Sequence, residues 1–349
     1  MPVAEAVEPG NSPESKGAPA VLPVAVDAMG GDFAPAEIVA GARRAFEELG
    51  IPVVLVGPGD GSLGDTGGLE VIAASEVIEM DDDPAKSVRN KKDSSLVRAA
   101  EAVRDGRASA MVSAGNTGAA MASALLRMGR LRGVMRPAIA TPLPALSGAP
   151  TLLVDAGANA ECQPEWLVQF AQMGAAFATA RYGTARPKVA LLSIGEEASK
   201  GNGLVKATHE LLTGGGGEPG FEFVGNVEGR DLLTGDVDVV VTDGFTGNVA
   251  LKTLEGALRA FMTILGKVFA TSEETKAAGD VLAPSLLEYA LRLDPEETGG
   301  AMLLGVDGVC VISHGSSSAR AIVNAVRVAH DSAAGGLSQR LGDAVSPGA

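Results

Sequence analysis

ASAMVSAGNTGAAMASALLRM, residues 108–128, holds a short apolar run, a polar turn and a helix-forming stretch in that order. The run Ala108–Ser113 is continuous rather than alternating, which is typical of a parallel strand covered on both faces. The turn GNTG then leads into a predicted helix over Ala119–Met128. Such a strand, turn and helix form the repeating unit of an α/β fold.

Further predicted strands lie on both sides of this stretch. They are Val21–Val26, Ile51–Val56, Val71–Ile78, Leu152–Val154, Val189–Ile194, Val237–Thr242 and Val309–Ile312. Helices are predicted over residues 35–49 and near Ser95–Arg104, capped by Ser94 or Ser95, whereas residues 80–93 are predicted as a charged loop. Strands and helices that alternate in this way predict a doubly wound, mostly parallel sheet with helices on both faces.

Composition limits the domain organisation and the classes of partner. The chain has 349 residues, of which 46% are hydrophobic and 20% charged, enough to bury a large core. No long linker interrupts residues 21–332, so we expect one α/β domain between a disordered tail (1–20) and a flexible tail (333–349). The net charge of −15 disfavours broad nucleic-acid binding. Two cysteines and three scattered histidines suit a reducing cytoplasm and indicate no metal site.

Four glycine-bearing loops follow predicted strands: Gly115–Ala119, Lys200–Gly203, Gly244–Asn248 and Gly315–Arg320. Backbone N–H groups at helix starts attract anions, so each loop is a candidate anion site, although each is also typical of an ordinary junction. Four of them together favour a site for phosphate, and none matches a classical nucleotide-binding motif. The candidate phosphate- and substrate-binding residues are Asp27, Gly30, Gly31, Asn116, Thr117, Gly118, Gly201, Asn202, Gly247, Ser316 and Ser317.

The polar side chains in these loops suggest acyl or phosphoryl chemistry without a covalent enzyme intermediate. There is no G-x-S-x-G nucleophile motif, and neither Cys162 nor Cys310 has an activating neighbour in sequence. A reaction in which phosphate is the nucleophile needs cations and oxyanion donors, for which Lys200, Asn248 and His314 are candidates. Asp243 would orient the lysine or accept a proton. A solvated loop lysine, a helix cap and a turn former are the structural alternatives for Lys200, His314 and Asp243.

Several long motifs, taken together, closely resemble the PlsX family of bacterial phosphate acyltransferases. In chain order they are VAVDAMGGDFAP (24–35), SAGNTGA (113–119), VDAGANAECQPEWLVQFAQMG (154–174), SIGEEASKGN (193–202), GNVEGRD (225–231), VVVTDGFTGNVALKTLEG (239–256) and ISHGSSSARAI (312–322). The resemblance runs from about Leu22 to about His330. The tail 1–20 is extra, and Ser318 stands where the family pattern leads us to expect asparagine.

The resemblance implies reversible transfer of a long-chain fatty acyl group from acyl carrier protein to inorganic phosphate. The acyl phosphate product would supply a membrane glycerol-3-phosphate acyltransferase in phospholipid synthesis. It also implies a Rossmann-like fold similar to phosphotransacetylases and isocitrate-type dehydrogenases, a homodimer, and no metal or nucleotide cofactor. By motif position the best catalytic candidates are Lys200, Asp243 and Asn248, followed by His314.

A basic segment suggests where an acidic carrier protein would bind. Residues 106–154 contain no Asp or Glu in a chain of net charge −15. The candidate docking residues in this segment are Arg127, Arg130, Arg132 and Arg136. Complementary charge would steer the encounter with the carrier, unless these arginines pair with acids elsewhere or lie at a dimer contact.

The apolar stretch Val249–Phe269 predicts one helix with a broad hydrophobic face, followed by a second helix that folds back, so that residues 249–293 form a helical projection. Core or dimer packing and weak peripheral membrane contact both remain open. Two alternative functions also remain open: a short-chain phosphate transacetylase that uses a coenzyme A thioester, and a non-catalytic, membrane-associated scaffold. A dehydrogenase is a weaker alternative, because the chain shows no dinucleotide or metal motif.

Overall fold

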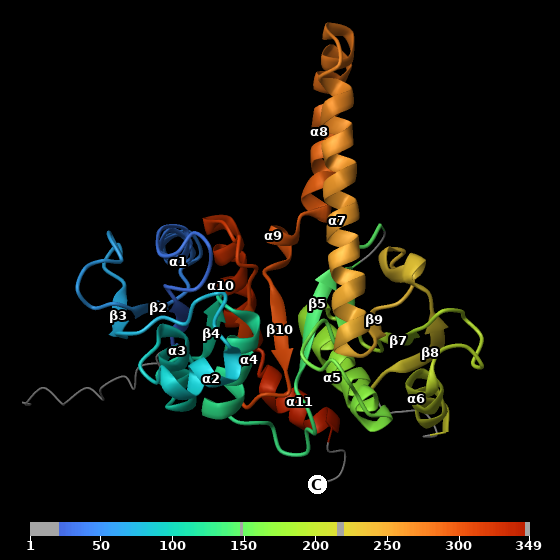
Figure 1. Cartoon of the computed structure of the whole chain (residues 1–349), viewed down its shortest axis with the longest axis horizontal. Coiled ribbons are helices and arrows are strands. Elements are labelled where there is room, and N and C mark those ends of the chain that lie inside the picture. The colour runs from blue at the N-terminus through green and yellow to red at the C-terminus, as the bar shows by residue number, and fades with distance from the viewer. Residues whose placement is uncertain (1–20, 147–148, 215–219, 346–349) are drawn as a thin grey trace, which may run out of the picture.

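The computed structural model describes residues 21–146, 149–214 and 220–345, and within them the strands form one eleven-stranded sheet (Figure 1). The order across the sheet is β3-β2-β1-β4-β11-β10-β5-β6-β9-β7-β8. The strands are β1 (Val24–Asp27), β2 (Val53–Gly57), β3 (Glu70–Ala73), β4 (Ala110–Ser113), β5 (Ala138–Leu143), β6 (Thr151–Val154), β7 (Lys188–Leu192), β8 (Glu222–Val227), β9 (Val239–Val241), β10 (Ala301–Leu304) and β11 (Cys310–Ile312).

The sheet consists of two parallel groups that run in opposite directions. The β1 group is β3, β2, β1, β4 and β11, and the β9 group is β6, β9, β7 and β8. Strands β10 and β5 lie between the groups, and the pairs β11–β10, β10–β5 and β5–β6 are all antiparallel. Three successive reversals leave the β9 group antiparallel to the β1 group. The polar loops that follow the β1 group and those that follow the β9 group therefore leave opposite edges of the sheet.

Helices cover both faces of the sheet, as predicted. They are α1 (Ala36–Leu49), α2 (Pro84–Asn90), α3 (Ser95–Arg104), α4 (Thr117–Arg127), α5 (Pro164–Tyr182), α6 (Gly203–Gly214), the 3₁₀ helix η1 (Gly229–Leu233), α7 (Gly244–Phe269), α8 (Glu273–Leu293), α9 (Pro295–Thr298), α10 (Ala319–Ala334) and α11 (Leu337–Val345). One face carries α1, α10, α11, α5 and α6, and the other carries α2, α3, α4 and the base of α7.

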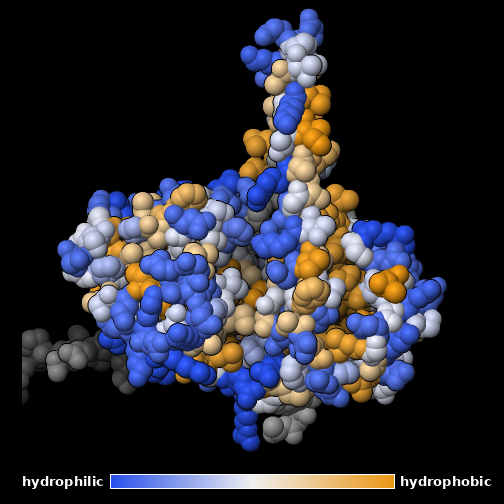
Figure 2. Space-filling model, viewed as in Figure 1, coloured by the Kyte–Doolittle hydropathy of each residue, from blue (hydrophilic) through white to orange (hydrophobic). Residues whose placement is uncertain are grey.

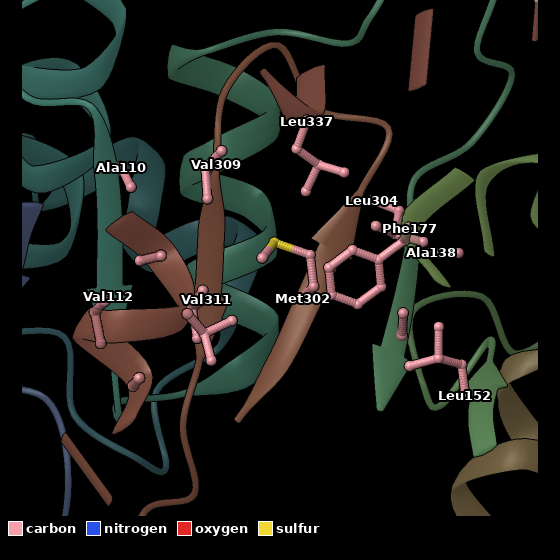
Figure 3. Close-up of a cluster of buried hydrophobic side chains, with 14 of the residues drawn as sticks. Ala110, Val112, Ala138, Leu152, Phe177, Met302, Leu304, Val309, Val311 and Leu337 are labelled. Carbon is pink, nitrogen blue, oxygen red and sulfur yellow. The ribbon is translucent and has the colours of Figure 1, made fainter. Parts of the chain in front are cut away.

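The core is made of closely packed aliphatic side chains on both faces of the sheet. In the part shown in Figure 3, Met302 of the central strand β10 lies between Val311 of β11 and Phe177 of α5. All three side chains are buried. Because β10 and β5 connect the two groups through this core, the continuous apolar runs recognised in the sequence end up in one sheet.

Two local features of the sequence have clear outcomes. Ser94 caps α3 as predicted, since its hydroxyl accepts a hydrogen bond from Val97 N–H at 3.4 Å. The charged stretch predicted as a loop instead contains the short helix α2. Asp83 caps that helix by accepting a hydrogen bond from Lys86 N–H at 2.8 Å, and Pro84 occupies its first position. A cap followed by proline is a helix-start signal that outweighs the local density of charge.

The C-terminal segment differs from the flexible tail expected over residues 333–349. Helix α10 continues to Ala334, and α11 follows with Leu337 and Leu341 buried against α5. The spacing of these two leucines places them on one helix face, which is how a short helix docks onto a core. The tail predicted over residues 1–20 lies outside the described residues, as do residues 346–349.

Helices α7 and α8 form the predicted projection, which extends far beyond the sheet (Figure 1). Only the base of α7 is packed against the core, through Leu251 and Leu254. Farther out, Phe261 and Ile264 are each 61% exposed, so the apolar face is not buried within one chain. None of the helices described here combines the length and apolarity that a membrane crossing requires.

Candidate functional site

The loop after β6 holds the start of α7 in place. Asp155 in this loop is completely buried, and its carboxylate accepts hydrogen bonds from the N–H groups of Ile139, Gly157, Ala158 and Asn159 at 2.7–3.1 Å. The Asn159 side-chain amide donates a fifth bond at 2.8 Å. Burial raises the pKa of Asp155, although these donors act in the opposite direction. Asp155 thus organises a rigid loop at the carboxyl end of the β9 group.

Helix α7 begins in direct contact with that loop. The N–H of Gly244 donates to the Asn159 carbonyl at 2.7 Å. A Cβ atom on Gly247 would lie 1.9 Å from the Asp155 carbonyl oxygen, and one on Gly244 would lie 2.7 Å from the Asn159 carbonyl oxygen. Both glycines are therefore required by close packing. The sequence pattern indicates Gly247 only as an anion-binding residue, and it does not place Asp155 or Asn159 among the site residues.

Asp243 and Asn248 occupy the first turns of α7. Both carboxylate oxygens of Asp243 bind Thr246, one accepting its N–H and the other its hydroxyl, each at 2.8 Å. This arrangement makes Asp243 the N-cap of the helix. Asn248 is exposed and lies against Gly157, where a Cβ atom would be 3.6 Å from the Asn248 Cβ. In the first turn of α7, the N–H groups of Gly244, Thr246 and Gly247 already donate to protein oxygens, which leaves the Phe245 N–H and the Asn248 amide as hydrogen-bond donors.

Lys200 lies in the loop after β7, next to β9 in the sheet, so this loop and the start of α7 leave neighbouring strands. The Lys200 side chain is exposed, and no carboxylate of the described residues lies within ion-pair distance of its ammonium group. Asn202 caps α6 by accepting a hydrogen bond from Val205 N–H at 3.0 Å. Gly201 has φ +96°, a conformation that favours glycine.

In the β1 group, the loop after β1 packs on the loops after β4 and β11. Asp27 is only 2% exposed, and it accepts hydrogen bonds from the Ser113 hydroxyl at 2.7 Å and from Met29 N–H at 3.3 Å. Burial raises the pKa of the Asp27 carboxyl. Asp32 N–H donates to the Gly315 carbonyl at 2.8 Å, and Gly31 lies next to the same carbonyl. Asp27 therefore supports these loops from within and does not line the surface.

The start of α4, a predicted anion site, is largely covered. The Asn116 side chain caps the helix by accepting a hydrogen bond from Ala119 N–H at 3.0 Å, and its amide donates to the carbonyls of Met80 and Asp82 at 2.9 and 3.2 Å. Pro84 lies over Gly118, where a Cβ atom would be 2.7 Å from the proline ring. Thr117 remains exposed.

One side-chain contact joins the two strand groups at this site. His314, in the loop after β11, has its Nε2 atom 3.5 Å from the Lys252 ammonium of α7. The other ring nitrogen, Nδ1, lies 2.8 Å from the Ser316 hydroxyl, and Ser317 is buried. Lys252 also forms an ion pair with Glu255 at 2.8 Å. The sequence pattern identifies His314 and Ser316 as candidates but does not place Lys252 among the site residues.

The two cysteines are not activated. Burial raises the pKa of Cys162 and of Cys310 to about 12, so both are protonated thiols at neutral pH. Within the described ranges, no cluster of three or more His, Cys, Asp or Glu side chains could hold a metal ion. The chemistry that these residues offer is anion binding by backbone N–H groups, lysines and hydroxyls.

Known proteins resemble this chain over most of its length. Residues 22–340 match the family model described as fatty acid synthesis protein. A phosphate acyltransferase from Heliobacterium modesticaldum is 50% identical over 314 residues, covering 88% of this chain and 92% of that protein. One from Elusimicrobium minutum is 52% identical over 316 residues, covering 88% and 91%.

Solved structures share the fold at low sequence identity. A phosphotransacetylase from Streptococcus pyogenes has a TM-score of 0.59 and 18% identity, covering 90% of this chain and 94% of that one. A branched-chain phosphotransacylase from Enterococcus faecalis has a TM-score of 0.58 and 16% identity, covering 89% and 99%. The predicted phosphotransacetylase-like α/β fold is confirmed.

Proposed function

Because the chain belongs to the family of fatty acid synthesis proteins, whose members include the phosphate acyltransferases it resembles, we propose that it transfers a long-chain fatty acyl group from acyl carrier protein to inorganic phosphate. The observation that carries the proposal is identity of about one half over nearly nine-tenths of the chain. The site supports it, because the exposed Asn248 amide and the exposed Lys200 ammonium follow neighbouring strands while both cysteines are inert.

The proposed reaction is attack by phosphate on a thioester. An oxygen of hydrogen phosphate forms a bond to the acyl carbonyl carbon, and the bond between that carbon and sulfur breaks. The proton of hydrogen phosphate passes to the departing thiolate. The products are acyl phosphate and the free thiol of the carrier, and no external reductant or covalent enzyme intermediate is needed.

Each candidate residue receives a role that its position permits. Lys200, in the loop beside the start of α7, stabilises the negative charge that develops in the reaction, and backbone N–H groups in the loop 314–317 hold the phosphate. The Asn248 amide and the Phe245 N–H stabilise the oxyanion that forms on the acyl carbon. Asp243 acts by holding the first turn of α7 in position, since both of its oxygens are bound to Thr246.

The deciding experiment is release of free carrier thiol from long-chain acyl carrier protein, with and without inorganic phosphate. Phosphate-dependent release, with acyl phosphate trapped by hydroxylamine, supports the proposal. Release only from a coenzyme A thioester would assign the protein to short-chain transacetylation instead. No release from either donor would contradict an enzymatic function and would favour the scaffold alternative.

We also propose that acyl carrier protein docks on the arginine segment. Arg136 lies over the Trp166 ring at 4.8 Å, and the next residue, Pro137, accepts a hydrogen bond from Asn159 of the site loop. Arg132 is exposed. Arg127 and Arg130 are less available, because Arg127 lies 3.7 Å from Glu101 and Arg130 donates to the Met135 carbonyl.

Reversing the two available charges tests this docking. The double variant Arg132→Glu, Arg136→Glu is expected to raise KM for acyl carrier protein by about 10-fold, because rim charges mainly steer association. KM for phosphate should stay within twofold of the wild-type value. Arg186→Glu, an exposed reversal beside β7, is the control. An unchanged KM for the carrier in the double variant would exclude docking at this segment.

We propose further that the projection is a contact between two copies of the chain. Orange, hydrophobic surface follows the shaft of the projection and gives way to blue at its tip (Figure 2). The exposed apolar side chains there include Phe261, Met262, Ile264, Val268, Val281 and Leu287. Such a continuous apolar face on one chain is typical of a surface that another protein or a lipid covers.

The double variant Phe261→Asp, Ile264→Asp is expected to sediment as a monomer of 35.1 kDa, whereas the wild-type chain sediments as a dimer. Buried aspartates in an apolar interface carry a large desolvation cost, which is the reason for the loss. Lys267→Asp, an exposed change on the same helix, should leave the dimer intact. A monomeric wild-type chain that floats with liposomes would instead assign the projection to peripheral membrane contact.

A further inference from the structure

Among the described residues, the side chain of Lys252 joins α7 to the loop after β11 through its contact with His314. Its ammonium is 3.5 Å from His314 Nε2, and it is 2.8 and 3.1 Å from the two Glu255 carboxylate oxygens. The Lys252 side chain is nevertheless 50% exposed. A surface ion pair with Glu255 alone would add about 1 kcal/mol or less to the free energy of unfolding. Such a pair would not explain why the Lys252 ammonium also lies against His314.

The position of Lys252 on α7 places it in line with the candidate oxyanion donor. Asn248 and Lys252 are four residues apart, so they lie on the same helix face, one turn from each other. Asn248 contacts Gly157 of the β9 group, and Lys252 contacts His314 of the β1 group. This face of α7 therefore carries a row of polar groups from one strand group to the other, and it ends at His314 and Ser316.

The hydrogen-bond geometry leaves this row able to bind an anion. An ammonium has three N–H donors, and the Glu255 carboxylate accepts from two of them. On the far side of the ring, His314 Nδ1 accepts a hydrogen bond from the Ser316 backbone N–H at 3.3 Å and lies 2.8 Å from the Ser316 hydroxyl, so a neutral imidazole carries its proton on Nε2. The Nε2 proton and the third ammonium proton are then two donors facing each other across 3.5 Å, and a phosphate oxygen can accept from both.

We propose that Lys252 is a phosphate ligand of this site, and that it holds the attacking phosphate together with His314 and Ser316. The inference rests on the proposed function, since it names the cation that fixes the nucleophile of that reaction. Glu255 weakens the attraction for a dianion but keeps the ammonium beside His314, so that little side-chain entropy is lost on binding.

Calorimetry tests the role of Lys252 directly. It measures binding of inorganic phosphate to the full chain without an acyl donor. Lys252→Met is expected to weaken binding by about 10- to 100-fold, as the loss of one charge-assisted hydrogen bond predicts. Lys252→Arg keeps the charge and should stay within about fivefold of the wild-type chain. Lys206→Met removes the same charge from the exposed face of α6 and serves as the matched control.

Steady-state kinetics separates a failure of this inference from a failure of the proposed function. Lys252→Met should raise KM for phosphate by a similar factor while KM for the acyl thioester stays within twofold. Phosphate-dependent thiol release with KM for phosphate unchanged in Lys252→Met would overturn the role of Lys252 and leave the function standing. Phosphate binding that depends on Lys252, without thiol release from any thioester, would overturn the function and leave the phosphate site standing.

Discussion

Lys200→Ala is expected to lower the turnover number of phosphate-dependent thiol release by about 10²- to 10³-fold, the loss typical of removing one preorganised electrostatic donor. The melting temperature should stay within about 1 °C, because the side chain is exposed and no described carboxylate pairs with it. The one hydrogen bond that Lys200 contributes to the loop is from its backbone N–H to the Glu197 carbonyl, and alanine keeps that bond.

Lys206→Ala is the control for this variant, since it removes an exposed lysine from the helix that follows the same loop. Its turnover should equal that of the wild-type chain. The two lysines of the site should also differ in kind: Lys252 governs phosphate affinity, and Lys200 governs turnover. Near-normal turnover in Lys200→Ala would show that Lys200 has no catalytic role, whatever the result with Lys252.

Gly247→Ala is expected to lower the free energy of unfolding by about 3 kcal/mol, at the upper end of overpacking effects. The added Cβ would lie 1.9 Å from the Asp155 carbonyl oxygen, which is main chain and cannot rotate away. The Asp155 loop cannot yield easily either, because its buried carboxylate accepts five hydrogen bonds. Displacement of the start of α7 by about 1 Å should also reduce turnover by about 100-fold.

Urea unfolding and the thiol-release assay measure these two effects. Gly256→Ala lies on the same helix, and its added Cβ meets no atom within 4 Å. That control should gain up to about 1 kcal/mol, since alanine is the better helix former. If Gly247→Ala proved as stable and as active as Gly256→Ala, the close contact between α7 and the Asp155 loop would not be essential to the site.

Asp155 shows why part of the site could not be predicted from the sequence. In the sequence it is an acid after an apolar run, as Asp27 and Asp243 also are. The structure separates the three: Asp155 organises a loop, Asp27 is buried beneath the loops of the β1 group, and Asp243 caps α7. The sequence signal for the role of Asp155 is the motif VDAGANA. Small residues after the aspartate let backbone N–H groups turn toward its carboxylate.

The sequence by itself determined the α/β class, helices on both faces of the sheet, the α7–α8 projection and the family. These follow from apolar periodicity, caps and contiguous motifs, all of which are local in the chain. Only the tertiary structure decided that the two parallel groups oppose each other, that residues 80–84 cover the start of α4, and that Lys252 faces His314. Those contacts join residues tens of positions apart, and they depend on how short strands such as β10 and β5 pair, which local patterns do not encode.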